Sequence, residues 1–174
     1  MATNRRDGRH DVKAKLLDAE TKALEAPHDH KDDLRLWLRL LTCSNLVESE
    51  IRRELRERFD TTLPRFDFLA QLERYPDGMT LGDLSKRMMV SNGNITAVAE
   101  RMLQAGLIER TPMPNDRRVQ IVKLTAPGRA EFANMATEHK RWIAGLFAGL
   151  RPAEIVELLR LLGKLKASVL GGSS

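Results

Sequence analysis

A run of small polar residues follows Ser91 and offers hydrogen-bonding groups at close spacing. Asn92, Asn94 and Thr96 fall in the first turns of a helix that Ser91 would cap, and Arg101 lies further along it. An asparagine amide can bond two edge atoms of an adenine, and a threonine methyl can contact the methyl group of thymine. These residues therefore have the chemistry to recognise base edges in a major groove. The alternative is a solvated polar helix face.

A second charged group lies between two short runs rich in Ile, Val and Thr. The runs, Leu107–Thr111 and Val119–Thr125, predict the two strands of a hairpin. Their connection, residues 112–118, contains two prolines and ends in Arg117 and Arg118. A stiff loop with arginines at its end suits a narrow, electronegative minor groove. The alternative is a surface hairpin with a solvated charge pair.

Local signals predict the elements that position these groups. Thr80 and Asp83 form a capping-box pattern, with Asp in place of the usual Glu or Gln, at the start of a short helix. A turn at Met89–Val90 leads to the helix capped by Ser91. The apolar residues of that helix have core-face spacing and are Ile95, Val98 and Met102. Helix, turn, helix and two-stranded ribbon together predict a winged helix-turn-helix.

The basic charge is concentrated in this region. Residues 86–129 contain eight Lys and Arg against three Asp and Glu, and their net charge of +5 equals that of the whole chain. The remainder is formally neutral, so the excess lies where a phosphate backbone would lie. Lys86 and Arg87 are the expected phosphate contacts. The predicted partner is double-stranded DNA.

The residues of this region also carry a family resemblance. The run LGDLSKRMMVSNGNITAVAERMLQAGLIERTPMPNDRRVQIVKLTAPG resembles the core of the MarR family of dimeric winged-helix regulators, and the flanking helices fit from about residue 31 to 170. The resemblance implies a mainly α fold with a small β-wing and dimerisation helices at both ends. It further implies that Arg118 enters the minor groove, that Asp116 holds its guanidinium, and that Arg117 favours phosphate.

A narrower resemblance covers residues 58–96. The stretch RFDTTLPRFDFLAQLERYPDGMTLGDLSKRMMVSNGNIT is similar to the CouR-like branch, whose members repress genes for aromatic-acid breakdown and release DNA on binding a hydroxycinnamoyl-CoA thioester. It implies a repressor of aromatic catabolism that an aromatic acid or acyl-CoA releases. The chain departs from the family in its longer N-terminal arm and in Arg151, which caps the last helix where Ser is more usual.

An effector site of this kind would need cations and aromatic walls. Arg35 and Arg39, one helical turn apart, could hold a carboxylate or CoA phosphates. Aromatic walls could come from Trp37, Phe66, Phe68 and Trp142. The alternative is a solvated basic stripe with core aromatics.

The chain has the organisation of one intertwined domain. Residues 1–30 form an arm with a short helix over 11–26, and 60–125 form the winged helix, with Pro64 in the first turn of its first helix. Dimerisation helices are expected over 31–59 and 126–170, the latter split into 126–150 and 152–170. Their leucine density exceeds what one chain can cover, which predicts a two-fold homodimer. The alternative is an intramolecular core.

Other chemistry receives little support. The chain has no nucleophile–base pattern, phosphate loop or dinucleotide fingerprint, so neither an enzyme nor a cofactor is expected. A metal at His28, Asp29 and His30 is also not expected, because such loop residues are more often solvated. A single cysteine and the lack of an apolar run near 20 residues predict a soluble, cytoplasmic protein without membrane contact.

Three other functions remain open. Cys43 could be a redox-sensing thiol, although its apolar neighbours favour a buried structural role. A sequence-tolerant architectural DNA protein could present the same wing and helix. An interaction module without DNA activity would not need the wing arginines.

Overall fold

The computed structural model describes residues 31–113 and 116–171 and divides the chain into two compact units, 1–60 and 61–174. The predicted arm, including His28–His30, lies outside the described residues.

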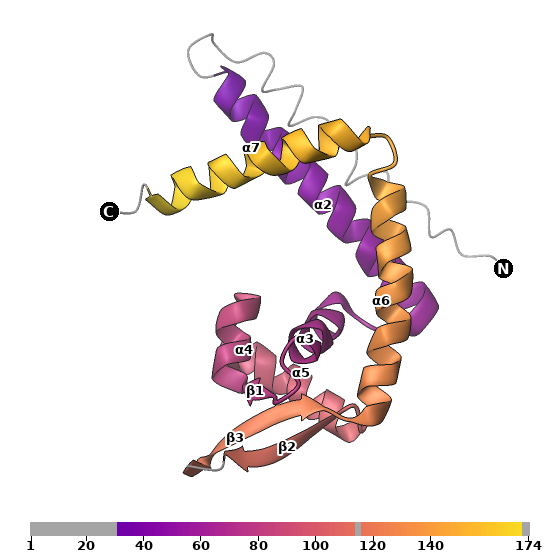
Figure 1. The fold of residues 1–174 in the computed structure, drawn as a ribbon, viewed down its shortest axis with the longest axis vertical. Helices are drawn as coiled ribbons and strands as arrows, with labels where there is room; N and C mark the ends of the chain where they lie inside the picture. Colours follow the sequence, from indigo (N-terminus) through magenta and orange to yellow (C-terminus); the bar gives the residue numbers. More distant parts are fainter. Residues whose placement is uncertain (1–30, 114–115, 172–174) are drawn as a thin grey trace, which may run out of the picture. The chain divides into compact units, whose positions relative to one another are not determined.

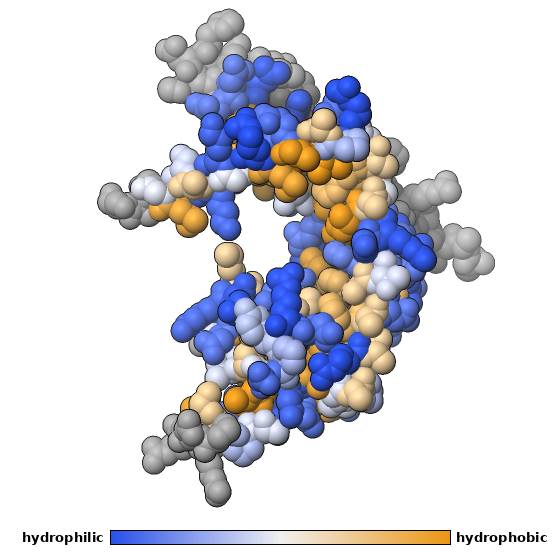
Figure 2. All heavy atoms as spheres, in the orientation of Figure 1, coloured by the Kyte–Doolittle hydropathy of each residue, from blue (hydrophilic) through white to orange (hydrophobic). Residues whose placement is uncertain are grey.

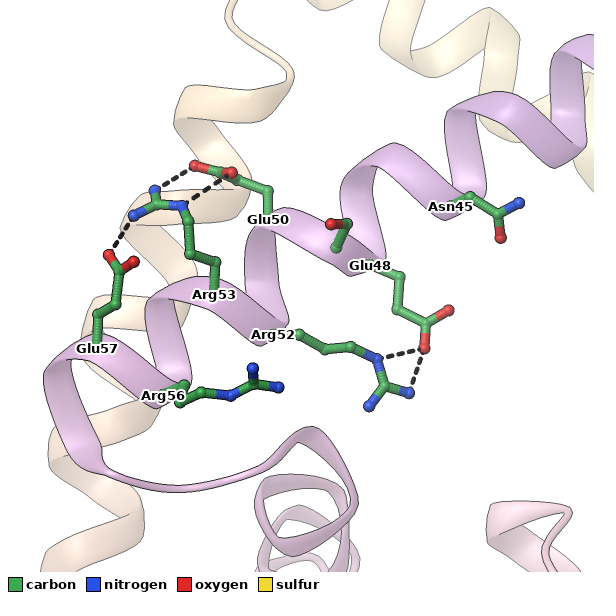
Figure 3. Close-up of a pocket in the computed structure, with 8 residues that line it drawn as sticks. Asn45, Glu48, Glu50, Arg52, Arg53, Arg56 and Glu57 are labelled. Carbon is green, nitrogen blue, oxygen red and sulfur yellow. Dashed lines mark hydrogen bonds and ion pairs between the residues drawn. The ribbon is translucent and has the colours of Figure 1, made fainter. Parts of the chain in front are cut away.

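The first unit contains one long helix, α2 (Lys31–Phe59), with the predicted bounds. Acidic residues in its first turn and basic residues in its last turn complement the helix dipole. Its C-terminal half carries ion pairs one turn apart. Arg52 donates to Glu48 at 2.8 Å, and Arg53 pairs with Glu50 and Glu57 (Figure 3). These pairs support the helix locally.

The N-terminal half of α2 presents apolar side chains instead. Leu36 and Trp37 are more than half exposed, at 54% and 58%. Cys43 is exposed as well, so the expectation of a buried cysteine is wrong for the single chain. The apolar residues next to Cys43 in the sequence implied that it is buried. In this stretch of α2, however, several large apolar side chains are themselves exposed to solvent.

The second unit is mainly helical with a small sheet, which confirms the predicted fold class (Figure 1). Its helices are α3 (Leu63–Glu73), α4 (Leu81–Met88), α5 (Asn92–Gln104), α6 (Ala126–Leu146) and α7 (Pro152–Gly171). Its strands are β1 (Met79–Thr80), β2 (Ile108–Met113) and β3 (Asp116–Leu124).

The sheet is antiparallel with the order β1-β3-β2, so the predicted two-stranded ribbon has a third strand. Met79 pairs with Val122 and Thr80 with Ile121. Gly78 permits this approach, because its φ is 83° and a Cβ there would lie 2.6 Å from the Val122 carbonyl oxygen.

The two long strands reach further into the wing than predicted. The sequence placed residues 112–118 in a loop, but β2 runs to Met113 and β3 starts at Asp116. Asp116, Arg117 and Arg118 therefore belong to a strand. The register becomes irregular between Pro112 and Met113, where proline cannot donate to the ladder.

The core of the second unit lies between the sheet and helices α3 to α6. It consists of fully buried side chains that include Phe68, Leu72, Leu84, Ile95, Met102, Val122 and Met135. Ile95 and Met102 confirm the predicted core face of α5. Val98 is only half-buried, and the small side chain of Ala99 is buried in addition.

Helices α6 and α7 differ in how they are covered. Helix α6 ends at Leu146, four residues before the predicted end, where turn hydrogen bonds from Ala148 and Leu150 replace the helix. Helix α7 buries no residue, and Val156, Leu159 and Leu170 are 66–68% exposed. Figure 2 shows hydrophobic side chains on the surface over α7. Among the described residues, no helix is both long and apolar enough to cross a membrane.

Candidate nucleic-acid interface

Helix α4 starts with the predicted cap. The Thr80 hydroxyl oxygen accepts a hydrogen bond from the Asp83 backbone N–H at 3.1 Å, and the hydroxyl donates to the Asp83 carboxylate at 2.7 Å. This arrangement satisfies one of the free N–H groups of the first turn and places an acidic group there. The start of α4 is therefore fixed by local chemistry.

The turn between α4 and α5 is held by Ser85, which sequence reasoning missed. Ser85 is buried, and its hydroxyl donates to the Val90 carbonyl oxygen at 2.7 Å. The Val90 N–H in turn donates to the Ser85 carbonyl oxygen at 3.2 Å. Met89 lies between them in the left-handed region, with φ 54°. Two hydrogen bonds thus set the direction in which α5 leaves the turn.

Helix α5 presents the predicted polar residues outward. The Ser91 hydroxyl accepts from the Asn94 N–H at 3.4 Å, a long capping bond. Asn94, Thr96 and Arg101 are exposed, while Ile95 on the opposite face is buried. Asn92 forms the first turn of α5. The structure therefore brings the predicted base-reading residues together at the start of one helix.

A basic hollow adjoins α4. It is lined by Tyr75, Met79, Asp83, Lys86 and Arg87. The Arg87 guanidinium carbon lies 4.4 Å from the centre of the Tyr75 ring, a cation–π distance. Lys86 and Arg87 are both exposed. Tyr75, which sequence reasoning did not single out, therefore restrains one of the two predicted phosphate-binding cations.

Ion pairs reduce the free positive charge around the wing. Arg110 pairs with Glu100 at 2.8 Å and joins β2 to α5, and Lys123 pairs with Glu109 at 3.2 Å across the strands. Arg129 lies 3.8 Å from Glu73. Three of the eight basic residues counted in the sequence thus have carboxylate partners. Of the described side chains, Lys86, Arg87 and Arg101 are left as the cations of the predicted interface.

The residues expected to bind an effector fall into two groups. Arg35, Trp37 and Arg39 lie on α2, where Arg35 pairs with Asp32 at 3.4 Å. The others lie in the second unit. Phe68 is fully buried, which favours the packing alternative for this residue.

Phe66 belongs to an aromatic cluster between α3 and α6. Its ring centre lies 4.6 Å from that of His139 and 5.6 Å from that of Phe132. His139 also meets Trp142 edge-on at 6.3 Å. Burial lowers the pKa of His139 because it disfavours the charged imidazolium. His139, which sequence reasoning did not single out, therefore joins Phe66 and Trp142 in this cluster.

Comparisons with known proteins agree with this geometry. Residues 61–119 match the model of the MarR family. These residues form a winged helix-turn-helix of the MarR family. This is a family of transcriptional regulators and not of enzymes.

The similarity to individual relatives extends beyond residues 61–119. The chain is 28% identical over 140 residues to the transcriptional regulator YsmB of Bacillus subtilis, covering 80% of this chain and 93% of YsmB. It is 34% identical over 97 residues to the transcriptional activatory protein BadR of Rhodopseudomonas palustris, covering 55% of each chain. The alignment thus spans about half of BadR.

A solved structure has the same fold. A cysteine-to-serine mutant of MarR from Escherichia coli, complexed with operator DNA, superposes with a TM-score of 0.69 over 80% of this chain and 99% of that one, at 24% identity. These comparisons support the family and give no support to the narrower CouR-like branch.

Proposed function

We propose that the chain is a homodimeric regulator that binds a pseudo-palindromic operator through α5 and the wing. The observation that carries this proposal is the exposed polar start of α5 beside the cations of α4. Asn94 and Thr96 are exposed on α5, and Lys86 and Arg87 flank the hollow on α4. Backbone cations position a helix-turn-helix on the duplex, and the start of the second helix reads base edges.

The wing adds a second contact in this proposal. Arg118 enters the minor groove, Asp116 orients it, and Arg117 contacts phosphate. Their position at the beginning of β3 supports this assignment. The Arg110–Glu100 pair supports it further, because it ties the base of the wing to α5.

Dimerisation supplies the symmetry that an operator requires. Helix α7 buries no residue in the single chain, and the N-terminal half of α2 also exposes large apolar side chains. Monomeric proteins rarely expose large contiguous apolar patches. We assign both regions, residues 31–59 and 126–170, to the interface with a second copy, giving one intertwined domain around the winged helices of 60–125.

We further propose release by an aromatic acid or aromatic acyl-CoA. On α2, Arg35 and Arg39 would bind its anionic groups and Trp37 would contact its ring. The candidate ring contacts of the second unit are Phe66, Phe68 and Trp142, of which Phe66 and Phe68 are buried there. The exposure of Arg35 and Trp37 favours this assignment. Repression is the expected outcome of operator binding. Activation is the alternative, because the relative BadR carries the name of an activatory protein.

Selection from a random duplex library with the full chain tests the DNA proposal. The expected product has two inverted half-sites about 10 base pairs apart. Recovery of unrelated sequences would contradict operator recognition and favour an architectural protein.

A thermal-shift series with aromatic acids and their CoA thioesters tests the effector. A ligand at 100 times its dissociation constant should stabilise the dimer by about 2.7 kcal/mol. The Arg35→Ala/Arg39→Ala double variant should keep operator binding and lose most of this shift. Equal shifts for both proteins would rule out the assigned site.

Cys43 permits a second candidate, a redox-switched regulator, because the thiol is exposed. A Cys43→Ser variant that stays bound to the operator under peroxide, while the wild type dissociates, would support it. Equal responses of the two proteins would exclude it.

A further inference from the structure

Met89 combines two features that the stability of the fold does not explain. Its side chain is 93% exposed, the highest value among the exposed large hydrophobic side chains that the structure describes. Its backbone adopts the left-handed conformation, with φ 54°. In this region the Cβ of an L-residue crowds the following carbonyl oxygen, so a non-glycine residue is strained. The side chain thus gains little from burial while its backbone carries a cost.

The turn itself does not require methionine. Its geometry is held by the N–H of Met89, which donates to the Lys86 carbonyl oxygen at 3.3 Å, and by the two bonds between Ser85 and Val90. Glycine or asparagine would make the same backbone bonds with less strain, and glycine is the common residue at this position after a helix. The side chain of Met89 therefore needs an explanation outside the turn.

The position of Met89 points to that explanation. It is the C-cap residue that follows α4, and it lies three residues before Asn92, the first residue of α5. In a bound helix-turn-helix, the first helix crosses the phosphate backbone while the start of the second reads base edges. The turn that joins the two helices is continuous with the base-reading start of α5, so its side chains lie next to that contact along the chain. Thymine is the base that presents a methyl group in the major groove.

We propose that Met89 makes an apolar contact with the C5-methyl group of one thymine in each half-site. Met89 is then a specificity-determining residue that adds a thymine preference beside the bases contacted by Asn92, Asn94 and Thr96. The inference rests on the proposed function, because it requires that the chain binds duplex DNA. This contact also explains why the strained backbone does not carry glycine. Glycine would relieve the strain, but it has no side chain that could reach the base.

The test removes the thymine methyl groups one at a time. Each thymine of a duplex selected by the wild-type protein is replaced by deoxyuridine, and the affinity of the full chain is measured by fluorescence anisotropy. The wild type should bind about fourfold more weakly at one position of a half-site, the fold-change that corresponds to about 0.8 kcal/mol for one buried carbon group. Met89→Gly should show no loss at that position, and Met89→Leu should retain the loss.

Unfolding measurements separate this contact from a folding defect. Met89→Gly should melt at or above the wild-type temperature, because glycine relieves the strained φ. Asp60→Gly is the matched control, since Asp60 also has a positive φ of 46° but lies outside α4 and α5. It should leave operator affinity unchanged.

The outcomes distinguish the inference from the function on which it rests. A wild-type protein that selects no sequence would overturn both. A wild-type protein that selects a half-site, with a Met89→Gly variant that shows the same deoxyuridine penalty, would overturn only the role of Met89.

Discussion

Replacing Gly128 by alanine tests how α6 is attached to the winged helix. A Cβ at Gly128 would lie 1.9 Å from the Leu107 carbonyl oxygen and 2.8 Å from its carbonyl carbon. Both partners are backbone atoms, so the first turn of α6 must move by more than an ångström. That movement disturbs the bonds made by Thr125, which accepts from the Gly128 N–H at 3.1 Å and donates to the Gly106 carbonyl oxygen at 2.7 Å.

The expected cost follows from these two effects. Overpacking of this kind costs about 1–3 kcal/mol, and loss of a helix cap costs about 1 kcal/mol. The higher helix propensity of alanine offsets up to about 1 kcal/mol. The Gly128→Ala variant should therefore lose roughly 1–4 kcal/mol of unfolding free energy. For a chain of this length, this lowers the melting temperature by roughly 2–16 °C.

Circular dichroism melting at a fixed protein concentration measures this loss. Gly145→Ala is the matched control on the same helix, because no described atom lies within 4 Å of a Cβ at that position. The control should melt at or slightly above the wild-type temperature. If Gly128→Ala melts together with the wild type, the close approach of α6 to Leu107 is refuted.

The remaining predictions concern four side chains. Lys86→Ala should reduce the slope of log affinity against log salt concentration by about 1. Arg118→Ala should reduce this slope and also change the preference for the bases beside the half-site. Fluorescence anisotropy at several salt concentrations measures both effects. Tyr75→Leu removes a cation–π contact of about 0.5–1 kcal/mol from the folded protein, so it should lower the melting temperature by roughly 1–4 °C. It should also weaken binding to unselected duplexes, because Arg87 is no longer restrained, while Tyr75→Phe should do neither. The pKa of His139 is lowered in the folded protein, so the unfolded chain binds a proton at a higher pH than the folded protein does. The free energy of unfolding should therefore fall as the pH drops from 6.5 to the pKa of the folded state. A His139→Phe variant should lack this part of the decline.

Features fixed by near neighbours could be predicted from the sequence. Thr80 and Ser91 cap helices with groups only three residues away, and the bounds of α2 follow from its uninterrupted helical residues. The apolar spacing of Ile95 and Met102 predicted the buried face of α5. The opposite face of the same helix, which carries the candidate site, was thereby predicted to be exposed.

Features that depend on distant partners could not be predicted. Strand β1 has only two residues, too few to show a strand pattern, and exists through pairing with β3. Gly128 and Tyr75 matter because of Leu107 and Arg87, which the sequence does not place beside them. The exposed Cys43 has a similar cause, because an apolar run reports a preference for burial but not what covers it in a single chain.

The ratio of the chain's affinities for specific and non-specific DNA tests most directly whether α5 and the wing recognise a DNA sequence. The affinity of the full chain for its selected duplex is compared with its affinity for a shuffled duplex of equal length, at physiological salt. Recognition through α5 and the wing predicts that the selected duplex binds about 10³–10⁷ times more tightly. It also predicts that Asn94→Ala lowers this ratio while leaving the affinity for the shuffled duplex nearly unchanged. A wild-type ratio near one would contradict the account, because it would mean that the basic surface attracts DNA without reading it.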